Sequence, residues 1–156
     1  MTGVFADALV AILAAMLIIA ATGDLRTRTI PNWLNGAIAV AAIPFWIASG
    51  LDPWPDMALQ IGIAAFVFVL FAIAFHFGAM GGGDVKMVTA LSLWLSLGAV
   101  VKLLVIMSIA GGVLTVVMLV RDRIAKSGKK LEIPYGVAIA FGGLAILTQR
   151  FLNHFV

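Results

Sequence analysis

Long apolar runs make up most of the chain, and short polar or Gly- and Pro-rich segments separate them. The runs cover about residues 4–22, 32–49, 57–78, 84–98, 100–120 and 133–152. A helix rises about 1.5 Å per residue, so a run of about 19 residues spans roughly 28 Å, close to the thickness of a bilayer's hydrocarbon core. The pattern therefore predicts one domain, residues 1–156, built from about six transmembrane helices.

The segments between the runs carry residues that begin and end helices. Pro31 and Pro134 stand at the start of apolar runs, where a missing N–H has no cost. The stretch SGLDPWPD at 49–56 predicts a turn, and we place a further break near Gly98. The hydrophilic stretch RDRIAKSGKKLE at 121–132 predicts a loop. The first run is too long for the core of a signal peptide and lacks a small-residue cleavage site, so we expect a retained helix.

Composition supports the membrane interpretation. The chain is 63% hydrophobic and 11% charged, with a mean hydropathy of +1.17. A soluble domain of this size could not bury so much apolar surface, and lipid requires each segment to satisfy its own backbone hydrogen bonds. The expected class is an all-α integral membrane protein. The absence of Cys excludes disulfides and thiolate metal sites.

The basic residues predict the orientation. One side of the predicted membrane would hold eight of the ten: Arg26, Arg28, Lys86, Arg121, Arg123, Lys126, Lys129 and Lys130. The other side would hold Lys102 and Arg150. Because Lys and Arg collect in cytoplasmic loops, we expect both termini on the outer side, and we interpret the pI near 9.7 as an orientation signal, with no nucleic-acid partner. The Trp residues lie near predicted span ends, as in an aromatic belt.

Two short segments match one another in this weakly charged sequence. Residues 23–26 read Gly-Asp-Leu-Arg, and residues 83–86 read Gly-Asp-Val-Lys. In the six-span topology, Asp24 and Asp84 lie at the same cytoplasmic depth. Ionisable residues at membrane helices are candidates for function. Two neighbouring carboxylates would share one proton, which suits general acid–base hydrolysis: one activates water and the other protonates or polarises the scissile amide.

The surroundings of the two aspartates differ in the sequence. Asp24 is predicted to follow a helix, whose negative end favours the neutral acid, and Asp84 to begin one, whose positive end favours the anion. The glycines at 81–83 leave room for an extended peptide near Asp84, or form a flexible turn. Taken singly, an aspartate at a helix end is more often a cap. His76 has no partner at metal-ligand spacing, so no metal site is expected.

With GDLRTRTIPN, GGGDVKM and IPYGVAIAFGG in order along the chain, the sequence resembles the type IV prepilin peptidases, membrane aspartic proteases with a Gly-x-Gly-Asp motif. The resemblance implies that Asp24 and Asp84 are the catalytic pair. It assigns Gly81, Gly83 and Lys86 to the supporting motif. Members cut prepilins or pseudopilins at the cytoplasmic face, ahead of the hydrophobic segment of the substrate.

The resemblance also sets the expected partners and limits. Larger members carry paired Cys-x-x-Cys motifs and methylate their product, and this chain has no Cys. It is similar to the short, peptidase-only form of tight-adherence (Flp) pilus systems, so neither methyltransferase activity, zinc nor another cofactor is expected. The implied location is the bacterial inner membrane, with the lipid bilayer and the prepilin as partners. The oligomeric state and the particular pilin stay open, as does methylation of the product by another enzyme.

Three alternatives use the same residues differently. A small transporter could use the aspartates as proton or cation sites, although such sites tend to lie near the bilayer midplane. A membrane scaffold subunit would use them only as helix caps. A preflagellin-type peptidase would share the chemistry and differ in its substrate.

Overall fold

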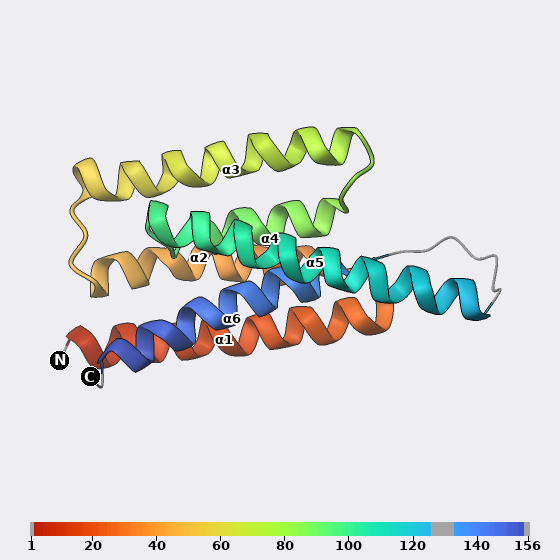
Figure 1. Ribbon diagram of the computed structural model, residues 1–156. Helices are drawn as coiled ribbons and strands as arrows, with labels where there is room; N and C mark the ends of the chain where they lie inside the picture. The colour runs from red at the N-terminus through yellow and green to blue at the C-terminus, as the bar shows by residue number, and fades with distance from the viewer. Residues whose placement is uncertain (1, 126–132, 155–156) are drawn as a thin grey trace.

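A computed structural model describes residues 2–125 and 133–154, and this part of the chain is helical without strands (Figure 1). The elements are α1 (Thr2–Thr27), α2 (Asn32–Ala48), the short turn η1 (Pro53–Met57), α3 (Ala58–His76), α4 (Gly82–Ser92), α5 (Leu97–Ala125) and α6 (Tyr135–His154). The predicted all-α class is confirmed for these residues. The predicted loop at 121–132 falls largely outside them, and α5 continues through its first residues.

The helices run up and down along one elongated bundle (Figure 1). Successive helices run in opposite directions, so α1, α3 and α5 end toward the same end of the bundle from which α2, α4 and α6 begin, and α5 projects beyond the start of α6 (Figure 1). We call this the aspartate end, because Asp24 and Asp84 both lie there. The start of α1 and the end of α6 lie together at the other end of the bundle (Figure 1), which we call the opposite end.

The shortest of the six α-helices, α4, lies at the centre of the packing. It contacts α2, α3 and α6, and most of its side chains are buried. Met87, Val88 and Leu91 have no exposed surface. A helix of 11 residues is about 16 Å long, half the thickness of a hydrocarbon core. Its role in the fold is therefore to carry Asp84 into the interior of the bundle.

Outer helix faces are apolar as well as exposed. The candidate membrane-spanning helices in the described chain are Gly3–Thr27, Pro53–His76 and Leu97–Ile124. On α3, Phe66 is 69% exposed and Val69 is 56% exposed. Contiguous apolar surface of this kind is rare on soluble monomers. The apolar helices suggest a membrane protein.

The predicted fourth span differs most from the observed helix. The apolar run continues to Gly98, but α4 ends at Ser92 and a turn precedes α5. Two indole groups hold this turn against α2: Trp46 Nε1 donates to the carbonyl of Leu93 at 2.8 Å, and Trp94 Nε1 donates to the carbonyl of Ile38 at 2.9 Å. These two Trp residues are buried, so the aromatic-belt interpretation is wrong for them. Their indole N–H groups donate hydrogen bonds inside the protein and not at the membrane surface.

Candidate active site

Asp24 lies on the last turn of α1, and the chain reverses immediately after it. The helix continues to Thr27, so Asp24 is inside the helix and does not follow it as predicted. Arg28 then adopts a left-handed backbone conformation with φ 56°, and its N–H donates to the carbonyl of Asp24 at 3.1 Å. A left-handed residue at this position is a common way to end a helix, although Gly is the usual occupant. The turn leaves the Asp24 side chain only 4% exposed.

Asp84 lies on the first turn of α4. Gly81 is the N-cap residue, and the N–H of Asp84 donates to the Gly81 carbonyl at 3.1 Å. The Asp84 carboxylate folds back over Gly81, so a Cβ added there would stand 2.9 Å from Oδ2 of Asp84. The side chain of Asp84 is 8% exposed. The first glycine of the motif thus makes room for the aspartate that follows it.

The start of α6 meets both aspartates. The N–H of Val137 donates to Oδ2 of Asp24 at 3.3 Å, and the amide of Gly136 interacts with both carboxylates. The two carboxylates are close enough for their charges to repel. The first amides of a helix have no partner within it and carry partial positive charge. The end of α6 therefore supplies donors to a pair of buried acids.

Gly136 makes this approach possible. A Cβ at that position would lie 2.8 Å from Oδ2 of Asp24 and 2.6 Å from Cδ1 of Ile30. Ile30 also packs against Gly83, whose added Cβ would lie 3.4 Å from it. The buried side chain of Ile30 thus fills the space between the starts of α4 and α6. Two glycines let both helix ends approach it.

Both aspartates line one cavity at the aspartate end, with a volume of about 570 Å³. Its other lining residues come from the connections that follow α1 and α3, from the first residues of α2 and α4, and from the start of α6 with the residue Ile133 before it: Arg28, Thr29, Ile30, Asn32, Gly78, Ala79, Met80, Gly81, Gly82, Gly83, Ile133 and Tyr135. A cavity of this size takes a segment of peptide or a small molecule. Both acids are accessible from the same space.

Helix α2 holds the glycine motif from behind. The Nδ2 group of Asn35 donates to the carbonyl of Gly83 at 3.1 Å, and Asn35 is 4% exposed. Lys86 Nζ donates to Oδ1 of Asn32 at 2.9 Å. This hydrogen bond joins α4 to α2, and Lys86 is absent from the residues that line the cavity.

The sequence predicted four of the residues that line the cavity and missed several that shape it. Asp24, Asp84, Gly81 and Gly83 were expected there. The sequence did not predict that the amides at the start of α6 would contact the aspartates, although the stretch IPYG, residues 133–136, predicted the start of a helix. The expected contrast between a negative and a positive helix end also changes, because the start of α6 faces Asp24. Each carboxylate meets a helix N-terminus.

The chemistry available is that of two buried carboxyl groups in an accessible cavity. Such a pair can hold one shared proton and act as acid and base together. Among the described residues, no group of three or more His, Cys, Asp or Glu side chains could hold a metal ion.

Comparison with known proteins identifies the family. Searches of curated proteins and of solved structures each found no match. A family model described as the type IV leader peptidase family matches residues 11–116, more than half of the chain. The match covers both aspartates and the glycine motif, and it ends before α6. It confirms the resemblance: the chain belongs to the type IV leader peptidase family.

Proposed function

We propose that this peptidase is a membrane-embedded aspartic endopeptidase in which Asp24 and Asp84 together activate water. The observation that carries the proposal is that two buried carboxylates from distant parts of the chain line one cavity, within range of each other's charge. Uncompensated burial of two acids is costly. Catalysis explains why a peptidase would keep two buried acids, because paired carboxylates are suited to amide hydrolysis.

The reaction needs one proton on the pair. The ionised carboxylate takes a proton from water as the water oxygen bonds to the scissile carbonyl carbon, and the protonated carboxyl group donates its proton to the carbonyl oxygen. Collapse of the tetrahedral intermediate breaks the C–N bond, and the leaving nitrogen takes the proton that one carboxyl group had accepted from water. As the carbonyl re-forms, a hydroxyl of the intermediate returns its proton to the other carboxylate. The amides at the start of α6 hold the carboxylates in position. The pair ends the cycle with one proton, as it began.

The proposed substrate is a prepilin or pseudopilin whose leader lies at the cytoplasmic surface and whose apolar helix lies in the bilayer. Of the seven Lys and Arg residues that the structure describes, five lie at the aspartate end, which favours a cytoplasmic location for it. A substrate anchored in the same membrane would reach the cavity already oriented, which raises its effective concentration.

Transport is the main alternative class, and the geometry favours hydrolysis. Transporter sites tend to lie where broken helices meet near the bilayer midplane. Here the aspartates lie on the last turn of α1 and the first turn of α4. A preflagellin-type substrate would use the same chemistry, and only an assay with substrates distinguishes it.

Co-expression with candidate prepilins tests the proposal. We expect the wild-type chain to remove the leader, and Asp24→Asn and Asp84→Asn each to abolish removal, because Asn keeps the size but can neither give nor take the proton. Both variants should accumulate in the membrane at the wild-type level. Cleavage by either variant at a rate near wild type would refute the dyad. Cleavage of preflagellins but no prepilin would reassign the substrate.

A further inference from the structure

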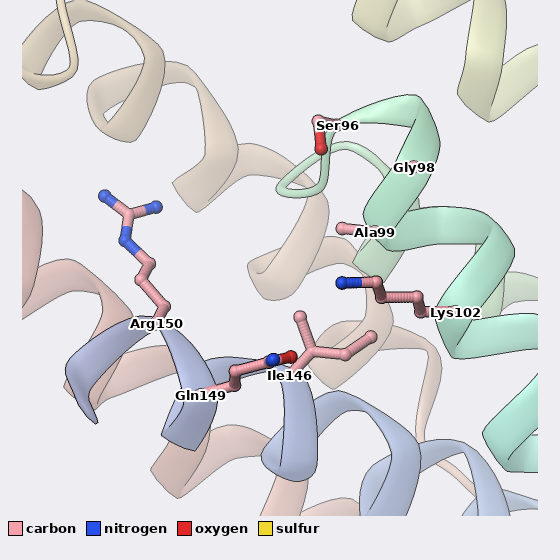
Figure 2. Close-up of a pocket in the computed structure, with 7 residues that line it drawn as sticks. All are labelled: Ser96, Gly98, Ala99, Lys102, Ile146, Gln149 and Arg150. Atoms are coloured by element: carbon pink, nitrogen blue, oxygen red, sulfur yellow. The ribbon is translucent and has the colours of Figure 1, made fainter. Parts of the chain in front are cut away.

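A second polar cavity lies at the opposite end of the bundle, far along the helices from the aspartates. It has a volume of about 480 Å³ and opens where the turn before α5 meets the last part of α6 (Figure 2). Its lining residues are Ser96, Gly98, Ala99, Lys102, Ile146, Gln149 and Arg150. None of the catalytic residues proposed above contributes to it.

Lys102, Arg150 and the Ser96 hydroxyl supply hydrogen-bond donors to this cavity, and Gln149 adds an amide group that can both donate and accept. Lys102 and Arg150 come from different helices, and they surround one space together with the Ser96 hydroxyl (Figure 2). No carboxylate lines the cavity, and neither cation forms an ion pair with another described residue. Arg150 instead lies over the ring of Phe45, at 5.1 Å from its centroid. Two cations on one cavity, with no carboxylate among its described lining residues, are suited to an anion.

The position of the cavity indicates that this anion belongs to a lipid. It lies at the beginning of α5, a candidate membrane span, and therefore at the depth where lipid headgroups meet water. Next to Lys102, Val101 and Val105 are each 54% exposed, so the side of α5 beside the cavity presents an apolar surface suited to acyl chains. A soluble anion has no apolar part that could pack against this surface.

An adjoining cavity has the character needed for the rest of a lipid molecule. Its volume is about 310 Å³, and it shares Ser96, Ala99, Ile146 and Arg150 with the first cavity. Most of the other lining side chains are apolar, among them Phe45 and Leu147. Gln60 also lines it, and its Oε1 is buried without a hydrogen-bond partner in the described chain.

We propose that the cavity at the opposite end binds one anionic phospholipid, with its phosphate between Lys102 and Arg150 and its apolar part against α5 and in the adjoining cavity. The proposal needs the chain to reside in a membrane and is independent of its peptidase activity. Two cations that line one cavity from separate helices distinguish this site from single cations that extend to the surface one by one.

Native mass spectrometry of the full chain in detergent tests the proposal, with phosphatidylglycerol as the probe. We expect one lipid to bind more tightly than later ones. The pair of changes Lys102→Gln and Arg150→Gln should weaken that first binding by about tenfold or more, since each charge-assisted bond to phosphate contributes measurably. The matched pair Arg121→Gln and Arg123→Gln removes two positive charges at the aspartate end and should leave the first binding unchanged.

Two further probes separate the sources of the ligand. Diacylglycerol with the same chains lacks the phosphate and should bind at least about tenfold more weakly if a charge-assisted bond is lost. Binding of glycerol phosphate as tight as that of phosphatidylglycerol would show a site for free phosphate and refute the lipid. Equal loss in both variant pairs, or equal binding of diacylglycerol, would also refute the proposal. If the double variant fails to fold, Lys102→Gln alone serves, because Lys102 is exposed.

Discussion

Gly136 lets the start of α6 approach Asp24, and its missing side chain has a measurable consequence. We expect Gly136→Ala to lower the cleavage rate by roughly ten- to a hundredfold, because a displaced catalytic group costs about that much. The new Cβ would push Asp24 from its bond with Val137. The free energy of unfolding should change by no more than about 1 kcal/mol, since Ala gains helix propensity while it crowds flexible side-chain ends.

Gly62 provides the matched control for this change. It lies in α3, and a Cβ added there would meet nothing within 4 Å. Gly62→Ala should leave the cleavage rate unchanged and raise the free energy of unfolding by about 0.5–1 kcal/mol. Leader-removal assays on purified protein and thermal unfolding measure both quantities. Equal rates for the two variants would show that the approach of α6 to Asp24 does not matter for catalysis.

Arg28 combines an unfavourable backbone with a useful charge. Its φ of 56° is unusual for a residue with a side chain, and its guanidinium interacts with Asp24. Arg28→Gly should stabilise the protein by about 1 kcal/mol, because the left-handed strain is lost and only part of it is offset by the freer unfolded chain. Cleavage should fall by about tenfold as the charge is removed.

Arg28→Lys separates the two effects, since it keeps the charge and the strained backbone. We expect near wild-type stability and partial activity, measured by unfolding and by leader removal. If Arg28→Gly were as active as wild type, the guanidinium would have no part in the reaction, and the strain would need another explanation.

At the scale of single residues, the sequence predicts the acids better than their surroundings. Asp24 and Asp84 were found because carboxylates are rare in apolar runs and these two have matching neighbours. Asn35 and Gly136 contribute through contacts with residues 48 and 112 positions away, Gly83 and Asp24. No local pattern encodes such a contact, because it depends on how the helices pack.

Helices α2 and α4 are joined by a side-chain hydrogen bond to a backbone carbonyl near each end of α4. The effects of removing the two bonds can therefore be compared. At the aspartate end Asn35 donates to Gly83, and at the opposite end Trp46 donates to Leu93. Asn35→Leu and Trp46→Phe each remove a side-chain donor from a backbone carbonyl. Both should lower the free energy of unfolding by about 1–3 kcal/mol. Only Asn35→Leu should also lower the cleavage rate, because Gly83 precedes Asp84.

For each variant, the decrease in the cleavage rate is compared with the decrease in the free energy of unfolding. A similar loss of rate in Trp46→Phe would mean that the whole α2–α4 pairing controls the site, and that the Asn35 contact has no local role. An unchanged rate in Asn35→Leu would exclude positioning of the glycine motif by α2.

The sequence predicted the presence of the helices more accurately than the residues at which they begin and end. Continuous apolar runs correspond to the long helices α1, α3 and α5. The run at 84–98 misled because burial inside a bundle and burial in lipid both select apolar residues. In α4 the residues are apolar because other helices cover them. Hydrophobicity alone cannot tell which of the two environments a short run will occupy.

The whole bundle places the aspartate cavity and the proposed lipid site at opposite ends, so the orientation of the molecule decides which side each one faces. We predict that the aspartate end faces the cytoplasm. Because the sequence has no Cys, one introduced Cys is a unique label. Phe77 lies in the connection after α3 at the aspartate end and is 79% exposed, and Trp54 lies before α3 at the opposite end and is 81% exposed.

Intact cells carrying Phe77→Cys or Trp54→Cys, treated with a membrane-impermeant maleimide, test the orientation. Trp54→Cys should react from outside, and Phe77→Cys should react only after the membrane is opened, because a charged reagent cannot cross the hydrocarbon core. The reverse pattern would place the aspartates outside, where a leader held at the cytoplasmic surface could not reach them. Reaction of both from outside would mean that α3 does not cross the membrane. Either result would contradict cleavage of the leader at the cytoplasmic surface, even if both aspartates are essential for activity.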